Sequence, residues 1–164
     1  MGERFCYTCQ RCHHEYSASI GSGFAYPKVY RAKLAEIDAG EYGPDWQELY
    51  RKTPYAAINA DYAIYLCNSC GAWEVSTDIS LYAPNDPDSI PQKQYGIKTV
   101  AEWGYVPYVI GWDLKNDYHI VKRYYRHCSQ CGKRMHKASA NDAVELQCPK
   151  CGSKNQANEF WTWD

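Results

Sequence analysis

The sequence predicts an α+β protein in which small antiparallel sheets surround cysteine pairs and a two-helix insert separates the first two pairs. Eight of the nine cysteines fall into four Cys-x-x-Cys pairs, here numbered as knuckles one to four in chain order. Apolar residues recur at helical spacing between knuckles one and two, whereas the segments beside the pairs alternate as strands do. The knuckles are Cys9/Cys12, Cys67/Cys70, Cys128/Cys131 and Cys148/Cys151.

The helices and strands follow from local signals. A helix is expected from Pro27 to Asp38 or Ala39, because proline suits a first helical turn and Gly40 is a good stop. A second helix should run from Pro44 to about Lys52, and Thr53-Pro54 should end it. Strands are expected at 4–8, 62–66, 73–76, 79–82, 106–110, 118–125 and 143–147, with 160–163 at a sheet edge or facing a partner.

The cysteine pairs predict metal sites. Each Cys-x-x-Cys turn places two thiolates on one side, and two such turns complete a tetrahedral sulfur shell around Zn²⁺. Four knuckles therefore predict two closed structural sites and two Zn²⁺. The chain has 164 residues with 16 Tyr and only three Phe, which predicts a thin aromatic core that needs such cross-links. Each site is expected to contribute about 10–16 kcal/mol of folding energy.

The spacing suggests how the knuckles pair. Knuckles three and four are separated by 16 residues, which fits a ribbon, and Gly132 and Gly152 follow them directly. Knuckle one would then pair with knuckle two. Cys6 and Cys9 share the same spacing, but the repeated pattern Tyr-x-Cys-x-x-Cys favours Cys9/Cys12 and leaves Cys6 as a small buried apolar residue. A mixed shell that uses His13 or His14 stays an alternative.

The segments Cys128-Ser-Gln-Cys131-Gly132 and Cys148-Pro-Lys-Cys151-Gly152 resemble the zinc-ribbon superfamily. This resemblance covers residues 128–152 and implies a metal-built fold rather than a particular function. The whole chain is loosely similar to small uncharacterised zinc-ribbon proteins of bacteria and their phages, which implies no activity. Rubredoxins share the Cys-Pro-x-Cys-Gly turn, so iron is the alternative metal.

Two domains are expected. Residues 1–82 would form an N-terminal knuckle domain with the helical insert, and residues 95–164 a C-terminal zinc-ribbon domain. The segment 83–94 contains Pro84, Pro87 and Pro91 among polar residues, so it is expected to be a linker or long loop.

We expect no enzyme, because a closed four-cysteine shell leaves no position for water or substrate. The chain has no glycine-rich phosphate loop, His-Glu-x-x-His or Gly-x-Ser-x-Gly motif. A metal-dependent nuclease built on His13 and His14 is a remote alternative, because the later histidine or asparagine on a helix is missing. Redox chemistry is disfavoured because the pairs precede glycines and connect strands.

A basic and aromatic segment suggests a nucleic-acid surface. Residues 115–137 hold seven Lys or Arg and one acid, although the whole chain balances 18 basic against 19 acidic residues. On a strand, Lys122, Tyr124 and Arg126 would share one face, as cations and rings do in single-strand binding sites. The candidate nucleic-acid-binding residues are Lys122, Arg123, Tyr124 and Arg126.

A protein partner is the preferred expectation, because the net charge of −1 does not favour nucleic acid. Tryptophan is enriched at interface hot spots, and the acidic segment 36–48 could meet a basic partner. We therefore expect a non-catalytic zinc-stabilised adaptor that could have a regulatory role, with nucleic-acid binding as the alternative and no small-molecule substrate. No signal peptide or apolar span is visible, which predicts a cytoplasmic protein without membrane contact. The candidate interface tryptophans are Trp103, Trp112, Trp161 and Trp163.

Overall fold

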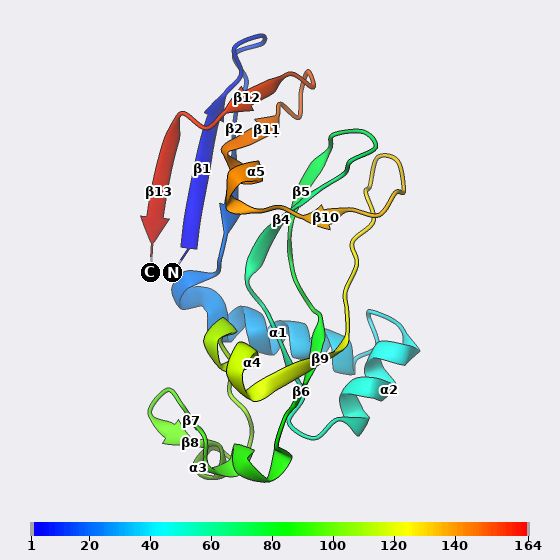
Figure 1. Ribbon diagram of the computed structural model, residues 1–164, viewed down its shortest axis with the longest axis vertical. Coiled ribbons are helices and arrows are strands. Elements are labelled where there is room, and N and C mark those ends of the chain that lie inside the picture. Colours follow the sequence, from blue (N-terminus) through cyan, green and yellow to red (C-terminus); the bar gives the residue numbers. More distant parts are fainter. Residues whose placement is uncertain (1, 164) are drawn as a thin grey trace. The chain divides into compact units, whose positions relative to one another are not determined.

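The computed structural model describes residues 2–163 and divides the chain into two compact units (Figure 1). Of the described residues, the knuckle unit contains 2–24, 61–77 and 125–163. The helical unit contains 25–60 and 78–124. This division differs from the expected boundaries at 1–82, 83–94 and 95–164. The helical unit consists of two insertions, one between knuckles one and two and the other between knuckles two and three.

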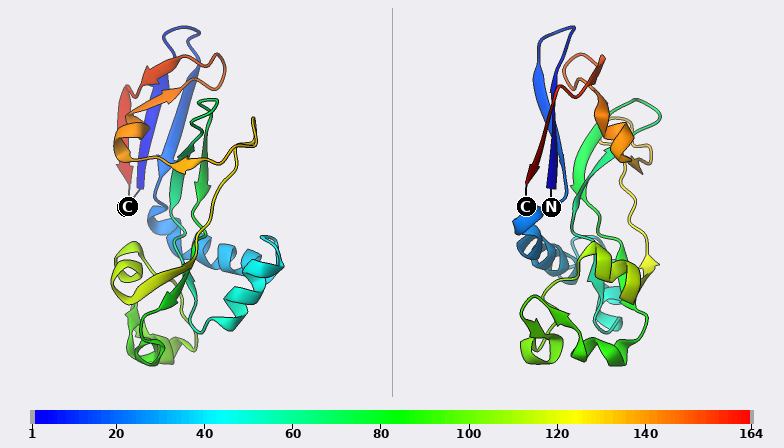
Figure 2. Two further views of the ribbon diagram at one scale, coloured as in Figure 1. Left: turned by 45° about the vertical axis from the view of Figure 1, so that its right-hand side comes forward. Right: turned by 60° about the vertical axis from the view of Figure 1, so that its left-hand side comes forward.

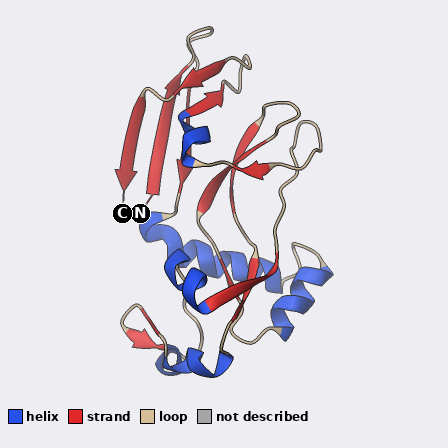
Figure 3. Cartoon of the chain, in the orientation of Figure 1, coloured by secondary structure: helices blue, strands red, loops and turns tan. Residues whose placement is uncertain are grey.

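Three of the four knuckles lie at the ends of β-hairpins in the knuckle unit, where Figure 3 draws them as loops between strands. The hairpins are β1 (Gly2–Thr8) with β2 (Glu15–Ile20), β4 (Tyr62–Leu66) with β5 (Trp73–Thr77), and β11 (Glu145–Gln147) with β12 (Lys154–Gln156). Knuckle three lies in a shorter turn, which a single bridge between His127 and Arg134 closes.

Strands from both ends of the described chain meet in one sheet. Strand β13 (Glu159–Trp163) pairs antiparallel with β1, giving the order β13-β1-β2 (Figure 2). This confirms the expected edge strand at 160–163. A second sheet has the order β10-β4-β5, with β10 at His136–Lys137. The predicted strand 143–147 is correct only in its last part, because helix α5 (Ala140–Val144) precedes β11 and Ser139 caps that helix.

The core of the knuckle unit follows strand alternation. Phe5 and Tyr7 point inward from β1, and they pack with Ala18 from β2 and Ile64 from β4. Leu146 of β11 completes this cluster, which brings the last hairpin onto the first two. A smaller cluster beside it contains Ala63, Tyr65, Cys67, Cys128 and Met135.

The two predicted helices are confirmed in the helical unit. Helix α1 spans Tyr26–Asp38 after a 3₁₀ turn at Gly23–Ala25, and α2 spans Pro44–Lys52. The remaining elements are short and surround a core that includes Tyr30, Ile37 and Leu81. They are β3 (Ala57–Ile58), β6 (Leu81–Pro84) and β9 (Tyr118–Lys122) in the order β3-β6-β9, the 3₁₀ helix Pro87–Gln92, the hairpin β7 (Gln94–Tyr95) with β8 (Lys98–Thr99), α3 (Val100–Trp103) and α4 (Gly111–Asp117).

Three local expectations were wrong. The segment 83–94 is no linker: it continues β6 and forms the 3₁₀ helix, where Ile90 is buried in the core. The segment 106–110 forms no strand, although Val109 is fully buried. The strand predicted at 118–125 ends at Lys122, because Tyr124 turns into the aromatic core of the helical unit. Among residues 2–163, no helix has the length and apolarity that crossing a membrane requires.

Candidate metal centres

All four knuckles have the same backbone. The N–H of each first cysteine donates to the carbonyl of the fifth residue after it, and the fourth residue returns an N–H to the cysteine carbonyl. These bonds measure 2.8–2.9 Å. The fourth residue has a left-handed backbone, with φ of 75°, 70° and 74° at Gly71, Gly132 and Gly152. His13 adopts the same conformation with φ of 56°, so it is a histidine at a glycine position.

The structure gathers the cysteines into two groups of four, and the sulfurs of each group all lie within 4.8 Å of one another. Knuckles one and four form the first cluster, and knuckles two and three form the second cluster, so one pair is nested inside the other along the chain. The predicted pairing of one with two and of three with four was therefore wrong. The first cluster is Cys9, Cys12, Cys148 and Cys151; the second is Cys67, Cys70, Cys128 and Cys131.

Contacts between distant hairpins explain the nested pairing. The hydroxyl of Tyr16 donates to the carbonyl of Leu146 at 2.9 Å, and the Gln10 N–H donates to the Asn155 side-chain oxygen at 2.9 Å. The hydroxyl of Tyr7 also donates to the carbonyl of Ala143. These bonds hold the fourth hairpin on the first. The 16-residue spacing between knuckles three and four carries no information about these hydrogen bonds between the first and fourth hairpins.

The sulfur positions fit a tetrahedral metal. A metal–sulfur distance of 2.3 Å places the four sulfurs about 3.8 Å apart in a regular tetrahedron. In the first cluster, Cys9 and Cys151 are 3.5 Å apart, and Cys12 and Cys148 are 3.7 Å apart. The second cluster has distances of 3.4 Å and 3.6 Å between its corresponding sulfurs. Each cluster can thus hold one metal ion, and sulfur ligands of this geometry suit both zinc and iron.

Hydroxyl hydrogen bonding distinguishes the first cluster. The Ser153 hydroxyl lies 3.0 Å from the Cys9 sulfur and 3.2 Å from that of Cys151. This contact is the main reason why the pKa of Cys9 falls to about 5, and it also lowers the pKa of Cys151. The His14 backbone N–H favours the Cys12 thiolate, but burial and its cysteine neighbours outweigh this and raise the pKa to about 12. Without metal, the cluster therefore contains both thiolates and thiols.

The second cluster is more open. Cys70 and Cys131 are exposed, whereas Cys67 and Cys128 are buried. The backbone N–H of Cys70 is the main cause that lowers the pKa of Cys67 to about 7. The pKa of Cys70 itself rises to about 12: the Ala72 backbone N–H opposes the rise, but burial and the neighbouring sulfurs outweigh it.

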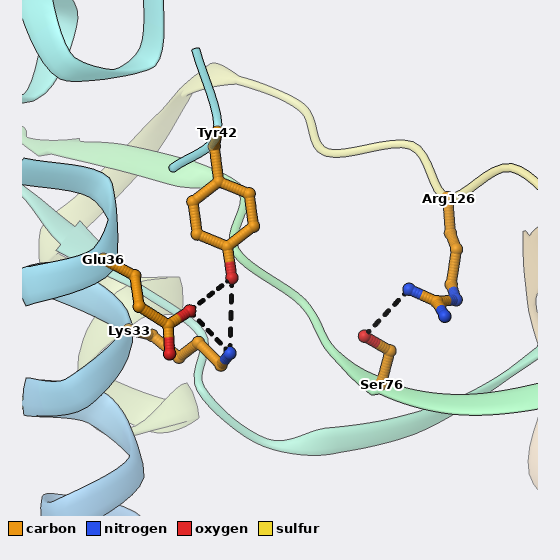
Figure 4. A network of polar contacts seen from close by, with 5 residues as sticks. All are labelled: Lys33, Glu36, Tyr42, Ser76 and Arg126. Atoms are coloured by element: carbon orange, nitrogen blue, oxygen red, sulfur yellow. Dashed lines mark hydrogen bonds and ion pairs between the residues drawn. The ribbon is translucent and has the colours of Figure 1, made fainter. Parts of the chain in front are cut away.

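Glu74 positions knuckle three. One of its carboxylate oxygens accepts the Ser129 N–H at 2.9 Å and the Ser129 hydroxyl at 2.6 Å. The other accepts the Arg126 Nε–H at 2.7 Å, and the same guanidinium reaches Ser76 at 3.4 Å (Figure 4). Sequence reasoning missed Glu74 because its partners lie 52 and 55 residues away. The sequence could have indicated Ser153, because this hydroxyl-bearing residue directly follows Gly152 at the end of knuckle four.

The other proposed ligands lie outside both clusters. His13 is exposed, and its backbone N–H closes knuckle one. His14 stacks its ring against Tyr16 at a centroid distance of 6.2 Å. Cys6 is half-buried in β1, where it pairs with Ser17 and Glu159. Cys9 and Cys12 are therefore the cysteines that knuckle one contributes.

The predicted nucleic-acid face does not form. Lys122 ends β9 with its ammonium 5.2 Å from the centre of the Trp46 ring, and Tyr124 packs edge-on against that same ring. Arg126 belongs to the knuckle unit and pairs with Glu74. Arg123 alone of the four is exposed.

The acidic segment is largely neutralised. Glu36 binds the Lys33 ammonium at 2.7 Å and accepts the Tyr42 hydroxyl at 2.6 Å (Figure 4). Asp38 pairs with Arg51 at 2.7 Å. Glu48 pairs with Lys52. Three of the five carboxylates in 36–48 thus have a basic neighbour, which weakens the case for an acidic docking face.

The tryptophans fall into different environments. Trp103 is partly buried, and its indole N–H donates to the Tyr95 carbonyl at 3.2 Å. Trp112 is 72% exposed and Trp161 is 60% exposed. The side chain of Trp163 lies outside what the structure describes.

No protein-family description, no curated protein and no solved structure matches this chain.

Proposed function

We propose that each cluster holds one Zn²⁺ and that the protein is a non-catalytic scaffold. Support comes from the sulfur geometry, which gives four ligands and no open position in either cluster. Zinc bound there would link two hairpins in the first cluster, and a hairpin and a short turn in the second. The protein would work in a reducing compartment such as the cytoplasm, because nine unbridged cysteines would be lost under oxidising conditions.

Cadmium-113 substitution tests the metal proposal and the pairing together. Elemental analysis of purified protein should give two zinc ions per chain and no iron. After exchange with ¹¹³Cd, one NMR resonance should couple to the β-protons of the first cluster and the other to those of the second. Coupling of one cadmium to knuckles three and four would overturn the nested arrangement.

We propose further that the scaffold is an adaptor for a protein partner. The observation that carries this proposal is Trp112, a large aromatic side chain that is 72% exposed on the short helix α4. Ile110 beside it is 45% exposed. Tryptophan is among the residue types most enriched at interface hot spots, and Trp112 and Ile110 both offer exposed apolar surface to a partner.

A pull-down from the native host's lysate tests the adaptor proposal. Zinc-loaded protein should retain a stoichiometric partner that survives nuclease treatment, and Trp112→Ala should lose it. Trp161→Ala is the matched control, because Trp161 is similarly exposed but lies in the knuckle unit. If nuclease releases everything, or if Trp112→Ala binds as wild type does, this proposal is wrong.

A second candidate function is nucleic-acid binding at a different place from the predicted strand. The guanidinium of Arg134 lies 3.3 Å from the centre of the Tyr125 ring, and both side chains are exposed. Lys133, His127 and His136 are exposed nearby in sequence. Such a cation and ring pair suits phosphate and base contacts. Arg134→Glu should then weaken binding of single-stranded oligonucleotides and flatten its salt dependence, whereas Lys28→Glu in the helical unit should not.

A further inference from the structure

The helical unit contains a cavity that is independent of the metal clusters and of Trp112. It is open to solvent on one side and has a volume of about 530 Å³, within the range of about 300–1,000 Å³ that small-molecule sites occupy. Its walls come from the second half of α1, the end of α2, the turn that follows α2, and Tyr105.

One wall of the cavity is held rigid by its own hydrogen bonds. Arg51 donates from Nε to the Asp38 carboxylate at 2.7 Å and from Nη2 to the Asp38 carbonyl at 3.0 Å. The Gln47 side chain donates to that same carbonyl at 2.6 Å. These bonds fix the end of α1 against α2, so this wall is formed before any ligand binds.

The cavity has one unbalanced positive charge. Arg51 and Asp38 neutralise each other, but Arg31 makes no hydrogen bond or ion pair with the residues of 2–163. Arg31 lies two helical turns before Asp38, and both side chains line the cavity. A guanidinium with free donors is suited to bind a carboxylate or phosphate in a forked geometry.

The turn after α2 presents a tyrosine in a strained conformation. The Ala56 N–H donates to the Thr53 carbonyl at 3.3 Å, which closes a turn with Pro54 and Tyr55 in the middle. Tyr55 has φ of 53°, a left-handed value that glycine or asparagine normally occupies at this turn position. Its ring lines the cavity and is 37% exposed. A bulky side chain kept at such a position points to a role for the ring.

We propose that this cavity binds a small organic anion that carries a planar ring. Arg31 pairs with the anionic group, and the rings of Tyr55 and Tyr105 contact the planar part. The anionic group is a carboxylate or a phosphate, and paired probes distinguish the two. The proposal does not depend on the adaptor function, since Trp112 and both clusters lie outside the cavity lining.

An NMR titration of the zinc-loaded full chain tests the proposal with two anions and their neutral analogues. The carboxylate arm compares 4-hydroxybenzoate with 4-hydroxybenzamide, and the phosphate arm compares adenosine monophosphate with adenosine. At least one anion should bind at least tenfold more tightly than its analogue, with shifts at Arg31, Tyr55 and Tyr105. If neither anion binds at about 10 mM, or if each analogue binds equally well, the proposal is wrong.

Three variants locate the site. Arg31→Gln should weaken anion binding at least tenfold, whereas Lys28→Gln, an exposed charge on the same helix outside the cavity, should leave it unchanged. Tyr55→Gly should weaken binding without lowering the Tm, because glycine relieves the left-handed backbone. Unchanged binding in Arg31→Gln, or an equal loss in Lys28→Gln, would place the anion elsewhere and overturn the proposal.

Discussion

The two clusters share one ligand set and one knuckle backbone but differ in their surroundings. In the first cluster no cysteine is exposed, and the Ser153 hydroxyl contacts two of the four sulfurs. In the second cluster two cysteines are exposed. Knuckle three is held there by a single β-bridge and by the hydrogen bonds to Glu74. The first cluster joins sulfurs 136 and 142 residues apart, whereas the second joins sulfurs 58 and 64 residues apart.

This difference shows that four identical ligands do not make two equivalent sites. The first cluster connects hairpins from the beginning and the end of the described chain, together with the sheet that β1 and β13 share. The second cluster fastens one short turn onto the β4–β5 hairpin. We therefore expect the first cluster to determine whether the knuckle unit folds, and the second to exchange its metal more readily.

The largest expected effect is the loss of a ligand from each cluster. Cys148→Ser should unfold the knuckle unit, because structural zinc sites contribute on the order of 10 kcal/mol of folding energy. Cys131→Ser should release one metal and loosen only the turn at 128–135. Metal analysis and amide NMR spectra of the full chain measure both effects, with Cys6→Ser as the control outside the clusters. Equal unfolding by the two ligand variants would contradict the comparison.

The next largest expected effect is a difference between the two clusters in how much metal affinity they lose in acid. A metal must displace any proton that a ligand carries. The pKa of Cys9 is about 5, so this thiolate is already free at pH 6, whereas Cys67 has a pKa of about 7 and takes up a proton as the pH falls through 7. Between pH 7.5 and 5.5, the second cluster should therefore lose about tenfold more metal affinity than the first.

Chelator competition followed at amides beside each cluster measures this difference in acid sensitivity. Ser153→Ala is the informative variant, because its hydroxyl is the main cause of the low Cys9 pKa. It should make the first cluster as acid-sensitive as the second. If the wild-type clusters release metal over the same pH range, the hydroxyl contact does not distinguish them.

The sequence predicted those features that depend on neighbouring residues. Each knuckle turn depends on the cysteine and the next five residues, and the helices at Tyr26–Asp38 and Pro44–Lys52 depend on prolines and apolar spacing within them. Their positions could therefore be predicted to within one residue. The mixed α/β class with small antiparallel sheets follows from the same local patterns.

The pairing of knuckles could not be predicted in this way. It depends on contacts such as Tyr16 with Leu146 and Ser129 with Glu74, which are 130 and 55 residues apart. A ribbon-like spacing of 16 residues only shows that two knuckles are close enough to share a metal. The prediction of a basic strand over 118–125 was wrong for a related reason. Tyr124 packs against Trp46, a distant residue in the sequence, and is more buried there than it would be on an exposed strand.

A pair of glycine substitutions should show how far the clusters affect each other. Gly71 and Gly132 have similar φ, so alanine at either should cost about 1 kcal/mol from the backbone. An added Cβ at Gly71 would also lie 2.1 Å from the side-chain nitrogen of Gln147, whereas at Gly132 it would meet nothing within 4 Å.

Gly71→Ala must therefore displace Gln147, the residue before Cys148 of the first cluster. We expect it to destabilise the protein more than Gly132→Ala does, by less than a further ~1 kcal/mol because only the end of a flexible side chain must move, and to weaken metal binding slightly at both clusters. Gly132→Ala should affect only the second cluster. Chelator titration of the two variants checks this, and identical behaviour would mean that the clusters are independent.

The smallest expected effect concerns His13, the histidine at a glycine position of knuckle one. A left-handed residue with a side chain costs about 1 kcal/mol, so His13→Gly should raise the free energy of unfolding by up to that amount. His14→Gly is the matched control and should destabilise, since it removes a ring that stacks on Tyr16. Denaturant unfolding of the metal-loaded protein measures both. A loss of stability in His13→Gly would mean that the imidazole itself supports the first cluster, and the two clusters would then differ in ligand environment more than their shared backbone suggests.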